Sequence, residues 1–301
     1  MKQPSPPQHK QQGVAIIMAL LLTTLAITIV ASLFWQQQVQ VRAIENQRLQ
    51  LQKQWILRGA LDWASLILRD DARYSSVDTL DEPWATPLAE THLDQYVENG
   101  RADSEAANTT LSGSISDAQA RFNLNNICPN GSIDPAAVAT FERLLTLLNL
   151  DPALAQTTAN QMALAKDGPQ PMGYIQVDDL LGVPGLTPAV LEKLKPYVIF
   201  LPGSTTVNIN TAPAQVIAAM FELSLSDANQ LVMTRKTAHF RDLADLSNRL
   251  PKQTFNAANI SVSSNHFLIN GKVRMNRARL DMQTLLQRNG MATKLLWIRE
   301  Y

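Results

Sequence analysis

The chain has 301 residues, and 46% of them are hydrophobic, which is enough to build a core and excludes disorder throughout. It carries 26 Lys and Arg against 26 Asp and Glu, and a formal charge of zero argues against a general binder of polyanions. Its one cysteine, Cys128, excludes an intramolecular disulfide and a cysteine-rich zinc site. The chain must therefore fold without covalent cross-links.

The N-terminal region predicts a membrane-spanning helix. Residues 14–35 carry no charged side chain, and a helix of that length would span roughly 33 Å, the thickness of a bilayer core. The apolar part of a cleavable secretory signal is shorter, about 7 to 15 residues. Small residues along the segment would let neighbouring helices approach closely: Ala15, Ala19, Thr23, Ala26 and Ala31.

The charges before this segment predict its orientation. Lys2 and Lys10 are the only charged residues that precede it. Because cationic flanks stay in the cytoplasm, we expect the N-terminus there and the bulk of the chain on the other side of the membrane.

The same helix is expected to continue beyond the membrane. Residues 36–70 contain no proline and only one glycine, so nothing there should end a helix. Five apolar residues fall on one face at helical spacing: Ile56, Ala60, Trp63, Ala64 and Ile67. This stripe predicts that the lower half of the helix packs against another element.

The middle of the chain predicts loops, a strand and then many short helices. Residues 71–110 lack periodicity, and residues 114–126 alternate as an extended segment does. Helix starts follow: Asp134, Asp151 and Thr187 each precede a proline, Ser224–Asp227 forms a capping box, and Thr211 is expected to cap the helix over 213–221. We therefore expect an all-helical insert with its own core over residues 133–260.

Two stretches of the insert, 178–198 and 208–246, look like helix-hairpin-helix units. The glycines at 182 and 185 suit a hairpin whose backbone approaches a phosphate, but residues 222–225 of the second unit contain no glycine. Residues 178–250 carry six basic and seven acidic side chains, so their net charge is −1. These features favour a packing role for both units, with DNA binding as the alternative.

Beyond Ser261 the pattern returns to strands. Asn270-Gly271 and Asn289-Gly290 are type I′ hairpin signals, residues 278–286 alternate with period two, and a bulge or turn is needed near Asn276. Residues 295–301 supply a last strand. Strands on both sides of the helices imply that the insert interrupts a sheet, which the lower half of the long helix covers.

These features resemble the type IV pilin and pseudopilin class, in which a basic leader ends in glycine before a long apolar helix. The leader would be residues 1–13, and the resemblance implies that a prepilin peptidase cuts between Gly13 and Val14 and that the new amine is methylated. The fifth mature residue would be Met18, where most members have a glutamate. A plain membrane anchor that is never cut is the alternative.

The missing glutamate, the segments RFNLNN and VNINTAP, and the C-terminal meander together resemble the K-type minor pseudopilins of the type II secretion system. This implies an α+β, pilin-like fold with six parts: leader 1–13, transmembrane helix 14–35, its continuation 36–70, pilin-like segment 71–132, helical insert 133–260 and C-terminal strands 261–301. The implied role is a non-enzymatic subunit of the pseudopilus tip, in the inner membrane with a periplasmic body. The implied partners are the I- and J-type minor pseudopilins, the H-type and major pseudopilins and the peptidase, with no nucleic acid.

The sequence offers little that points to catalysis. The four histidines are scattered, and Cys128 precedes Pro129 in a predicted turn. Acidic residues gather at two places, Asp70, Asp71, Asp78, Asp81 and Glu82 and then Asp178 and Asp179, where we expect solvated loop charges. We expect no organic cofactor; these carboxylates could hold Ca²⁺, although their spacing is not that of an EF-hand.

Overall fold

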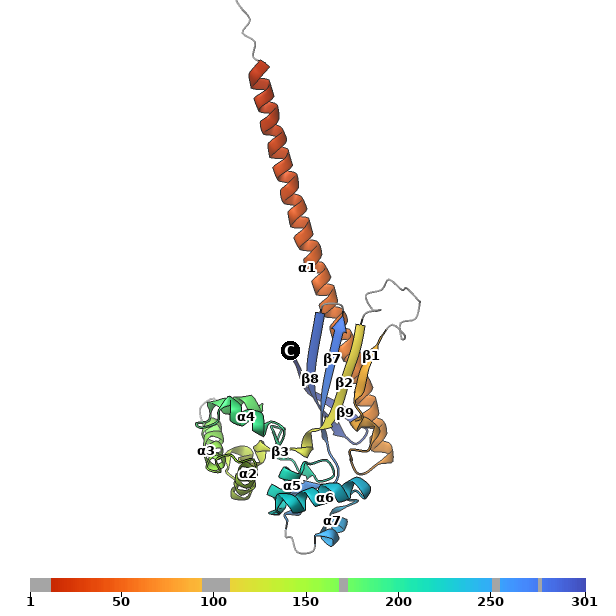
Figure 1. Cartoon of the computed structure of the whole chain (residues 1–301), viewed down its shortest axis with the longest axis vertical. Helices are drawn as coiled ribbons and strands as arrows, with labels where there is room; N and C mark the ends of the chain where they lie inside the picture. Colours follow the sequence, from red (N-terminus) through yellow and green to blue (C-terminus); the bar gives the residue numbers. More distant parts are fainter. Residues whose placement is uncertain (1–11, 94–108, 168–172, 251–254, 276–277) are drawn as a thin grey trace, which may run out of the picture. The chain divides into compact units, whose positions relative to one another are not determined.

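The computed structural model describes residues 12–93, 109–167, 173–250, 255–275 and 278–301. The chain forms two compact units, residues 1–55 and 56–301. One helix, α1 (Gln12–Tyr74), supplies the described part of the first unit and opens the second (Figure 1). This confirms the predicted continuous helix and extends it four residues beyond Asp70. The predicted leader lies outside the described residues, apart from the backbone of Gln12 and Gly13.

The second unit is built on a five-stranded antiparallel sheet with the order β1-β2-β7-β8-β9. Its strands are β1 (Leu88–His92), β2 (Thr109–Asp117), β7 (His266–Met275), β8 (Ala278–Asn289) and β9 (Ala292–Glu300). Strand β2 pairs with β7 over its whole length, although the helices lie between them in the sequence (Figure 1). The prediction that the helices interrupt a sheet is therefore confirmed.

The lower part of α1 covers one face of this sheet. Leu57, Leu61, Ala64 and Leu68 are buried against sheet residues that include Phe267, Ile269, Val273, Leu280, Met282 and Leu286. The predicted packing is confirmed, but the predicted stripe is centred on the wrong residues, since Trp63 remains 48% exposed. Leucines spaced four, three and four residues apart with Ala64 form the stripe that faces the sheet.

The opposite face of the sheet contacts the helical part of the chain. Leu268 and Leu285 are buried there with Ala118, Ile199 and Leu201, and Trp297 packs against them. Because both faces carry apolar residues, the sheet lies between α1 and the helical part.

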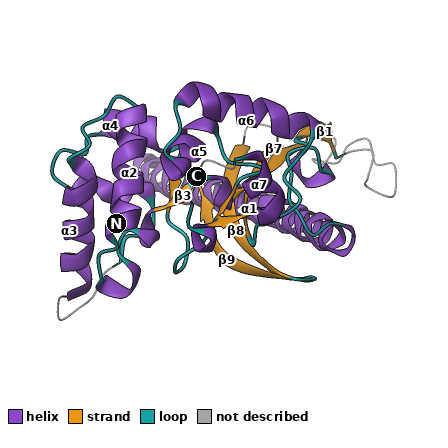
Figure 2. Ribbon diagram, turned by 90° about the horizontal axis from the view of Figure 1, so that it is seen from below, coloured by secondary structure: helices purple, strands orange, loops and turns teal. Residues whose placement is uncertain are grey.

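Within the described residues, six short α-helices form the helical part. They are α2 (Pro135–Leu147), α3 (Leu154–Asp167), α4 (Pro188–Leu194), α5 (Ala214–Phe221), α6 (Leu225–Thr237) and α7 (Leu243–Arg249). Figure 2 shows α2–α4 gathered together with α5–α7 beside them, and both groups contribute to one large apolar core. Short 3-10 helices occupy Pro83–Ala85, Ala118–Ala120, Leu124–Asn126, Pro129–Gly131, Val177–Gly182 and Ala257–Asn259.

Most of the predicted helix caps are in place. The Asp134 carboxylate accepts from the backbone N–H of Ala136 at 2.9 Å, Thr187 caps α4, and the Ser224 hydroxyl accepts from the Asp227 N–H at 3.1 Å. Thr211 is different. Its hydroxyl donates to the Asp117 carboxylate, and α5 begins after Pro213 without a side-chain cap.

The insert is not entirely helical. Two small parallel pairs include strands of the insert, β3 (Phe122–Asn123) with β4 (Val198–Ile199) and β5 (Val207–Asn208) with β6 (Ile260–Ser261), and β3 itself precedes the insert. The core of the helical part also contains Phe122, Leu124, Ile127 and Cys128. These four residues precede the expected boundary at residue 133. They belong to the helical core because β3 pairs with β4.

Three strand predictions were wrong in detail. The extended segment begins earlier and ends at Asp117, whose carboxylate accepts from the Gln119 N–H and starts a 3-10 turn. Strand β1 occupies part of a predicted loop. Asn270-Gly271 lies inside β7 rather than at a hairpin, since Gly271 pairs with Gly113 on one side and Met282 on the other.

The predictions for the last strands are confirmed in part. Met275 pairs with Ala278, and the alternation along β8 is present. The bulge or turn predicted near Asn276 lies outside the described residues. The hairpin at residues 289–292 is also present, with the register Asn289↔Ala292. Of the two central residues of this turn, Gly290 has a positive φ of 58° and Met291 does not, so the turn resembles type II′ rather than the expected type I′.

Candidate functional site

The apolar segment of α1 is the first surface suited to assembly. All its side chains from Val14 to Trp35 are exposed, because no other part of the described chain covers them. The hydroxyls of Thr23, Thr24 and Thr28 donate to backbone carbonyls of the same helix, at 2.9, 3.0 and 2.7 Å. Because these polar groups are already hydrogen-bonded, the helix can lie in hydrocarbon without leaving them unsatisfied.

The helix brings four of the five predicted small residues together. At about 100° per residue, four of them fall within about 80° of each other around the helix axis: Ala15, Ala19, Thr23 and Ala26. Ala31 lies about 120° from the centre of this group. A neighbouring helix could therefore approach closely along the first four. Met18 is exposed, and the backbone of α1 is helical through Gly13 and Val14. The predicted processing at this bond stays a prediction.

The first acidic group is a buried ion-pair network. Arg288 on β8 donates to both oxygens of Asp78, at 2.6 and 2.7 Å, and to Asp71 at 2.8 Å. Asp78 and Arg288 are buried, and the side chain of Asp71 is only 8% exposed. The expectation of solvated charges was thus wrong for these two acids, because Arg288, more than 200 residues away, neutralises them.

The electrostatics of this network are set mainly by burial. Desolvation, followed by the charge of Glu82, raises the pKa of Asp71 to about 6. Glu82 itself accepts from the backbone N–H of Thr79 at 2.9 Å and the indole N–H of Trp84 at 2.7 Å.

The same carboxylates are the one group among the described residues whose spacing could hold a metal ion. Oxygens of Asp71, Asp78 and Glu82 lie within 4.8 Å of one another. Arg288 already supplies positive charge there, so a cation would compete with its guanidinium. Calcium binding stays a prediction. In the second acidic group, Asp178 pairs with Lys195 at 2.9 Å and Asp179 accepts from the N–H groups of Ile175 and Gln176.

A second polar network joins the sheet to the helical part. Asp117, at the end of β2, accepts from Asn208 at 3.0 Å, from Ser264 at 2.6 Å and from Thr211. Its other oxygen accepts from the N–H of Gln119 at 2.7 Å. Burial raises the pKa of Asp117 to about 6, even though the hydrogen bonds from Ser264, Thr211 and the Gln119 N–H favour the ionised form. No pattern in the sequence identified this residue, because its partners come from distant segments.

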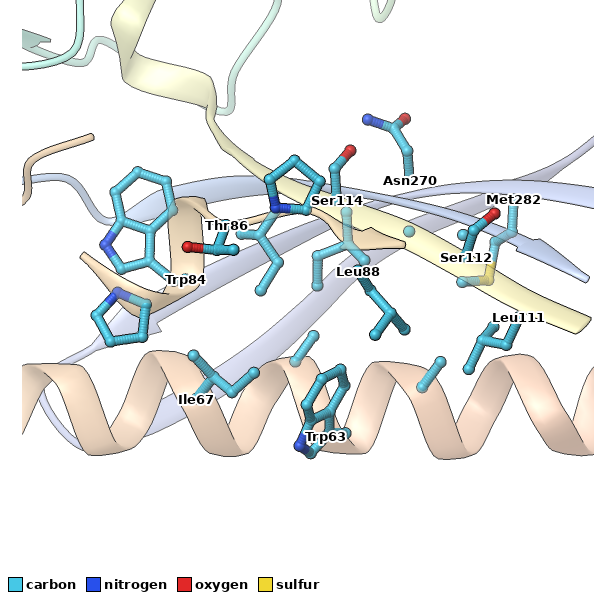
Figure 3. A pocket seen from close by; sticks show the side chains of 18 residues that line it. Trp63, Ile67, Trp84, Thr86, Leu88, Leu111, Ser112, Ser114, Asn270 and Met282 are labelled. Atoms are coloured by element: carbon cyan, nitrogen blue, oxygen red, sulfur yellow. The ribbon is translucent and has the colours of Figure 1, made fainter. Parts of the chain in front are cut away.

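An apolar groove of about 320 Å³ lies between α1 and the first two strands. Trp63 and Ile67 of α1 line one side, and Leu88 and Leu111 line the other (Figure 3). Gly113 and Gly271 also line it and leave space because they carry no side chain. The described residues that line the groove include no His, Cys, Asp, Glu or Lys.

Comparisons with known proteins identify the family. A family model described as type II secretion system (T2SS), protein K, matches residues 120–203 and 207–264 in two parts. Type II secretion system protein K of Klebsiella pneumoniae is 30% identical over 318 residues, covering 94% of each chain, and that of Pseudomonas aeruginosa is 29% identical over 309 residues, covering 92% of this chain and 89% of its own. The chain belongs to the type II secretion system protein K family.

A solved structure supports the fold. A chain in the crystal structure of the GspK-GspI-GspJ complex of enterotoxigenic Escherichia coli aligns with a TM-score of 0.69 and 19% identity. The alignment covers 85% of this chain and 98% of that one. The pilin-like fold with inserted helices is therefore shared. As a member of the protein K family, the chain is a minor pseudopilin, a structural subunit of a secretion system.

The two predicted helix-hairpin-helix units differ from each other. In the first, a 3-10 helix (Val177–Gly182) stands where an α-helix was expected before α4. In the second, α5 and α6 form a tight hairpin, and Glu222 takes the left-handed conformation at φ 55°. Arg235 of this hairpin is buried and donates to the Ile209 carbonyl at 2.6 Å. The assignment of these two units as helix-hairpin-helix motifs stays a prediction.

The described cysteine and histidines considered for catalysis are either buried or exposed in separate segments of the chain. Cys128 is fully buried, and its carbonyl accepts from Lys166 at 2.8 Å. His266 is buried 3.3 Å from the amide oxygen of Gln119, and burial lowers its pKa. His92 is exposed at the end of β1 and His239 is exposed in the loop between α6 and α7, and His9 lies outside the described residues.

Proposed function

We propose that this minor pseudopilin is anchored by α1 in the inner membrane, with its N-terminus in the cytoplasm and residues 56–301 in the periplasm. By length and composition α1 can cross a membrane once. Lys2 and Lys10 before the segment favour the cytoplasmic N-terminus. The exposed apolar surface of residues 14–35 is the observation that carries this proposal.

We further propose that it joins I- and J-type minor pseudopilins at the tip of the pseudopilus and supports export of folded proteins. The likeness in fold to a chain of the GspK-GspI-GspJ complex supports this assembly. The helices inserted between β2 and β7 add bulk that would collide with a subunit stacked above, so the tip suits this subunit. The H-type and major pseudopilins would be further partners.

Co-purification tests the assembly. The full chain, co-expressed with I- and J-type proteins from the same genome and extracted in detergent, should elute with both. A salt-sensitive gel shift with DNA, together with no association with these proteins, would instead support a membrane-tethered DNA receptor.

Processing is tested separately at Gly13. Replacing Gly13 with leucine should leave the leader attached, so mass spectrometry of the extracted protein should show the initiator end rather than an N-methylated Val14. Gly59→Leu, at an exposed position of the same helix, is the control and should be processed normally. A normally trimmed Gly13→Leu protein would contradict peptidase processing at this bond.

A further inference from the structure

A polar pocket lies where the sheet meets the helical part. It has a volume of about 270 Å³ and is lined by residues of β4, β7, β8 and β9, by residues 175–178 at the start of the 3-10 helix, and by Lys195 after α4. Phe200, Leu268 and Trp297 form apolar walls, and Arg121 and Arg299 contribute guanidinium groups. Apolar walls strengthen any charge interaction made inside the pocket.

Arg121 has no counter-ion among the described residues. It follows the 3-10 helix at residues 118–120, and its side chain is half-buried with no hydrogen bond or ion pair to a described residue. Asp117, four residues earlier, already accepts four hydrogen bonds from other groups. Burial lowers the pKa of Arg121, but a guanidinium stays charged at neutral pH. The charge of Asp117 partly offsets this burial, but the Arg121 guanidinium makes no ion pair with a described residue.

Arg299 is positioned but likewise unpaired. Its guanidinium lies 4.2 Å from the centre of the Trp297 ring, a cation–π contact that holds it at the pocket. Among the described residues it has no carboxylate partner. Lys195 also lines the pocket, but it pairs with Asp178 at 2.9 Å and Glu192 at 2.7 Å. Asp178 lines the pocket too, and its carboxylate is taken up by this pair with Lys195. The pocket therefore presents two arginines that make no ion pair with a described acid.

The position of the pocket makes it reachable by another protein chain. Strand β9 is the last strand of the sheet, so its outer edge is unpaired within the described residues. Trp297, Arg299 and Tyr301 alternate along this strand and all line the pocket. A segment that lies along the β9 edge would bring its own side chains to the same place.

We propose that this pocket is a docking site for an acidic side chain of a neighbouring minor pseudopilin, whose carboxylate pairs with Arg121 and Arg299. Guanidinium groups match a carboxylate with two parallel hydrogen bonds, which gives orientation as well as affinity. The inference rests on the proposed assembly and adds the surface through which part of it forms.

Binding of the purified full chain, in detergent, to a preformed I-type and J-type pair tests this. Arg121→Glu and Arg299→Glu should each raise the Kd at least tenfold, mainly through faster dissociation, and the double variant should raise it further. Lys236→Glu makes the same charge change on the exposed end of α6 and should leave the Kd unchanged. Arg121→Gln, which adds no repulsion, should give a smaller loss, and thermal unfolding of each variant checks that it is folded.

Rescue identifies the partner residue. One Asp→Lys or Glu→Lys change in the I- or J-type protein should restore binding to Arg121→Glu while weakening binding to the unchanged chain. An unaltered Kd for a folded Arg121→Glu/Arg299→Glu variant overturns the inference. If inorganic phosphate stabilises the unchanged chain but not this variant while the Kd is unaltered, the pocket takes a free anion, which also overturns it. If the unchanged chain fails to bind the pair at all, the proposed assembly fails instead.

Discussion

At the scale of single residues, the most consequential groups are buried charges whose partners are distant in the sequence. Asp78 lies in a stretch of loop residues, and no nearby residue indicates that it pairs with Arg288. Asp117 likewise meets Asn208 and Ser264 only in the folded chain. Sequence patterns depend on local spacing, so they assigned Asp78 to the charged loop residues, did not single out Asp117, and missed the burial of both.

Removing Arg288 should strongly destabilise the fold. Arg288→Met leaves Asp71 and Asp78 buried without a counter-charge, and such losses cost about 3 to 5 kcal/mol. Urea unfolding followed by tryptophan fluorescence measures this, since Trp84 packs edge-on against Phe267 in the neighbouring core. Arg279→Met, which removes an exposed partner of Asp281, is the control and should change stability far less. Equal effects of the two changes would contradict a structural role for the buried network.

Asp117 should make stability depend on pH. Its pKa rises from 3.8 in the unfolded chain to about 6 in the fold, so the folded state holds the proton more tightly. Its contribution to the free energy of unfolding is therefore largest below about pH 4 and falls by about 3 kcal/mol as pH rises through 6, at about 1.4 kcal/mol per pKa unit.

The variant Asp117→Asn isolates this contribution. Asp71, whose pKa is also raised, and His266, whose pKa is lowered, titrate in both proteins, so the difference between the two profiles reports Asp117 alone. Denaturant unfolding at pH 4, 5, 6 and 7 should show a flatter profile for the variant. Parallel profiles for the two proteins would show that Asp117 stays ionised over this range.

At the scale of elements, most helix caps were predicted correctly, whereas a hairpin signal was overridden by packing between distant segments. Caps such as Asp134 and Ser224 act within three residues, so the sequence alone located the starts of α2 and α6. Asn270-Gly271 carries an equally clear local signal for a hairpin, but Gly271 lies inside β7 instead. A Cβ there would come within 3.2 Å of Leu57 on α1, so the close approach of the helix explains the glycine.

The paired glycine on β2 gives a sharp test of this packing. A Cβ at Gly113 would lie 2.8 Å from the backbone oxygen of Asn270, which cannot move without disturbing the sheet. We expect Gly113→Ala to lower the free energy of unfolding by about 1 to 3 kcal/mol. Gly59→Ala meets open space on α1 and should raise it by about 0.5 to 1 kcal/mol, because alanine favours a helix. A neutral Gly113→Ala would mean that β2 and β7 can separate locally.

At the scale of the whole molecule, membrane attachment and folding depend on different parts of one helix. Residues 14–35 make no buried contacts within the protein, whereas the stripe from Leu57 to Leu68 is part of the core. The sequence predicted this division, because an unbroken apolar run and an amphipathic stripe are both local patterns, although the predicted stripe was centred on the wrong residues. It could not predict the sheet order, which depends on pairing between distant strands.

Charges in the first part should therefore release the protein from membranes without unfolding it. Leu25→Arg/Ile29→Arg adds about 5 to 7 kcal/mol to the cost of insertion, comparable to the total favourable contribution of the apolar residues in the segment. After alkaline extraction, more of this variant than of the unchanged protein should remain in the soluble fraction. Val39→Arg/Val41→Arg lies beyond the segment and should stay with the membrane. Full retention of the first variant would contradict anchoring by residues 14–35.

The pairing of β2 with β7 also imposes an order on biosynthesis. Residues 118–265 must all be made before Ile115 can meet Ile269, and until then the leucines of α1 have little of the sheet to cover. The helical part has its own core and is complete earlier, so it can fold first and bring the two strands together. During that interval the nascent chain exposes the apolar face of α1 and the unpaired edge of strand β2. We therefore expect a chaperone to bind these surfaces until about the last forty residues have been made.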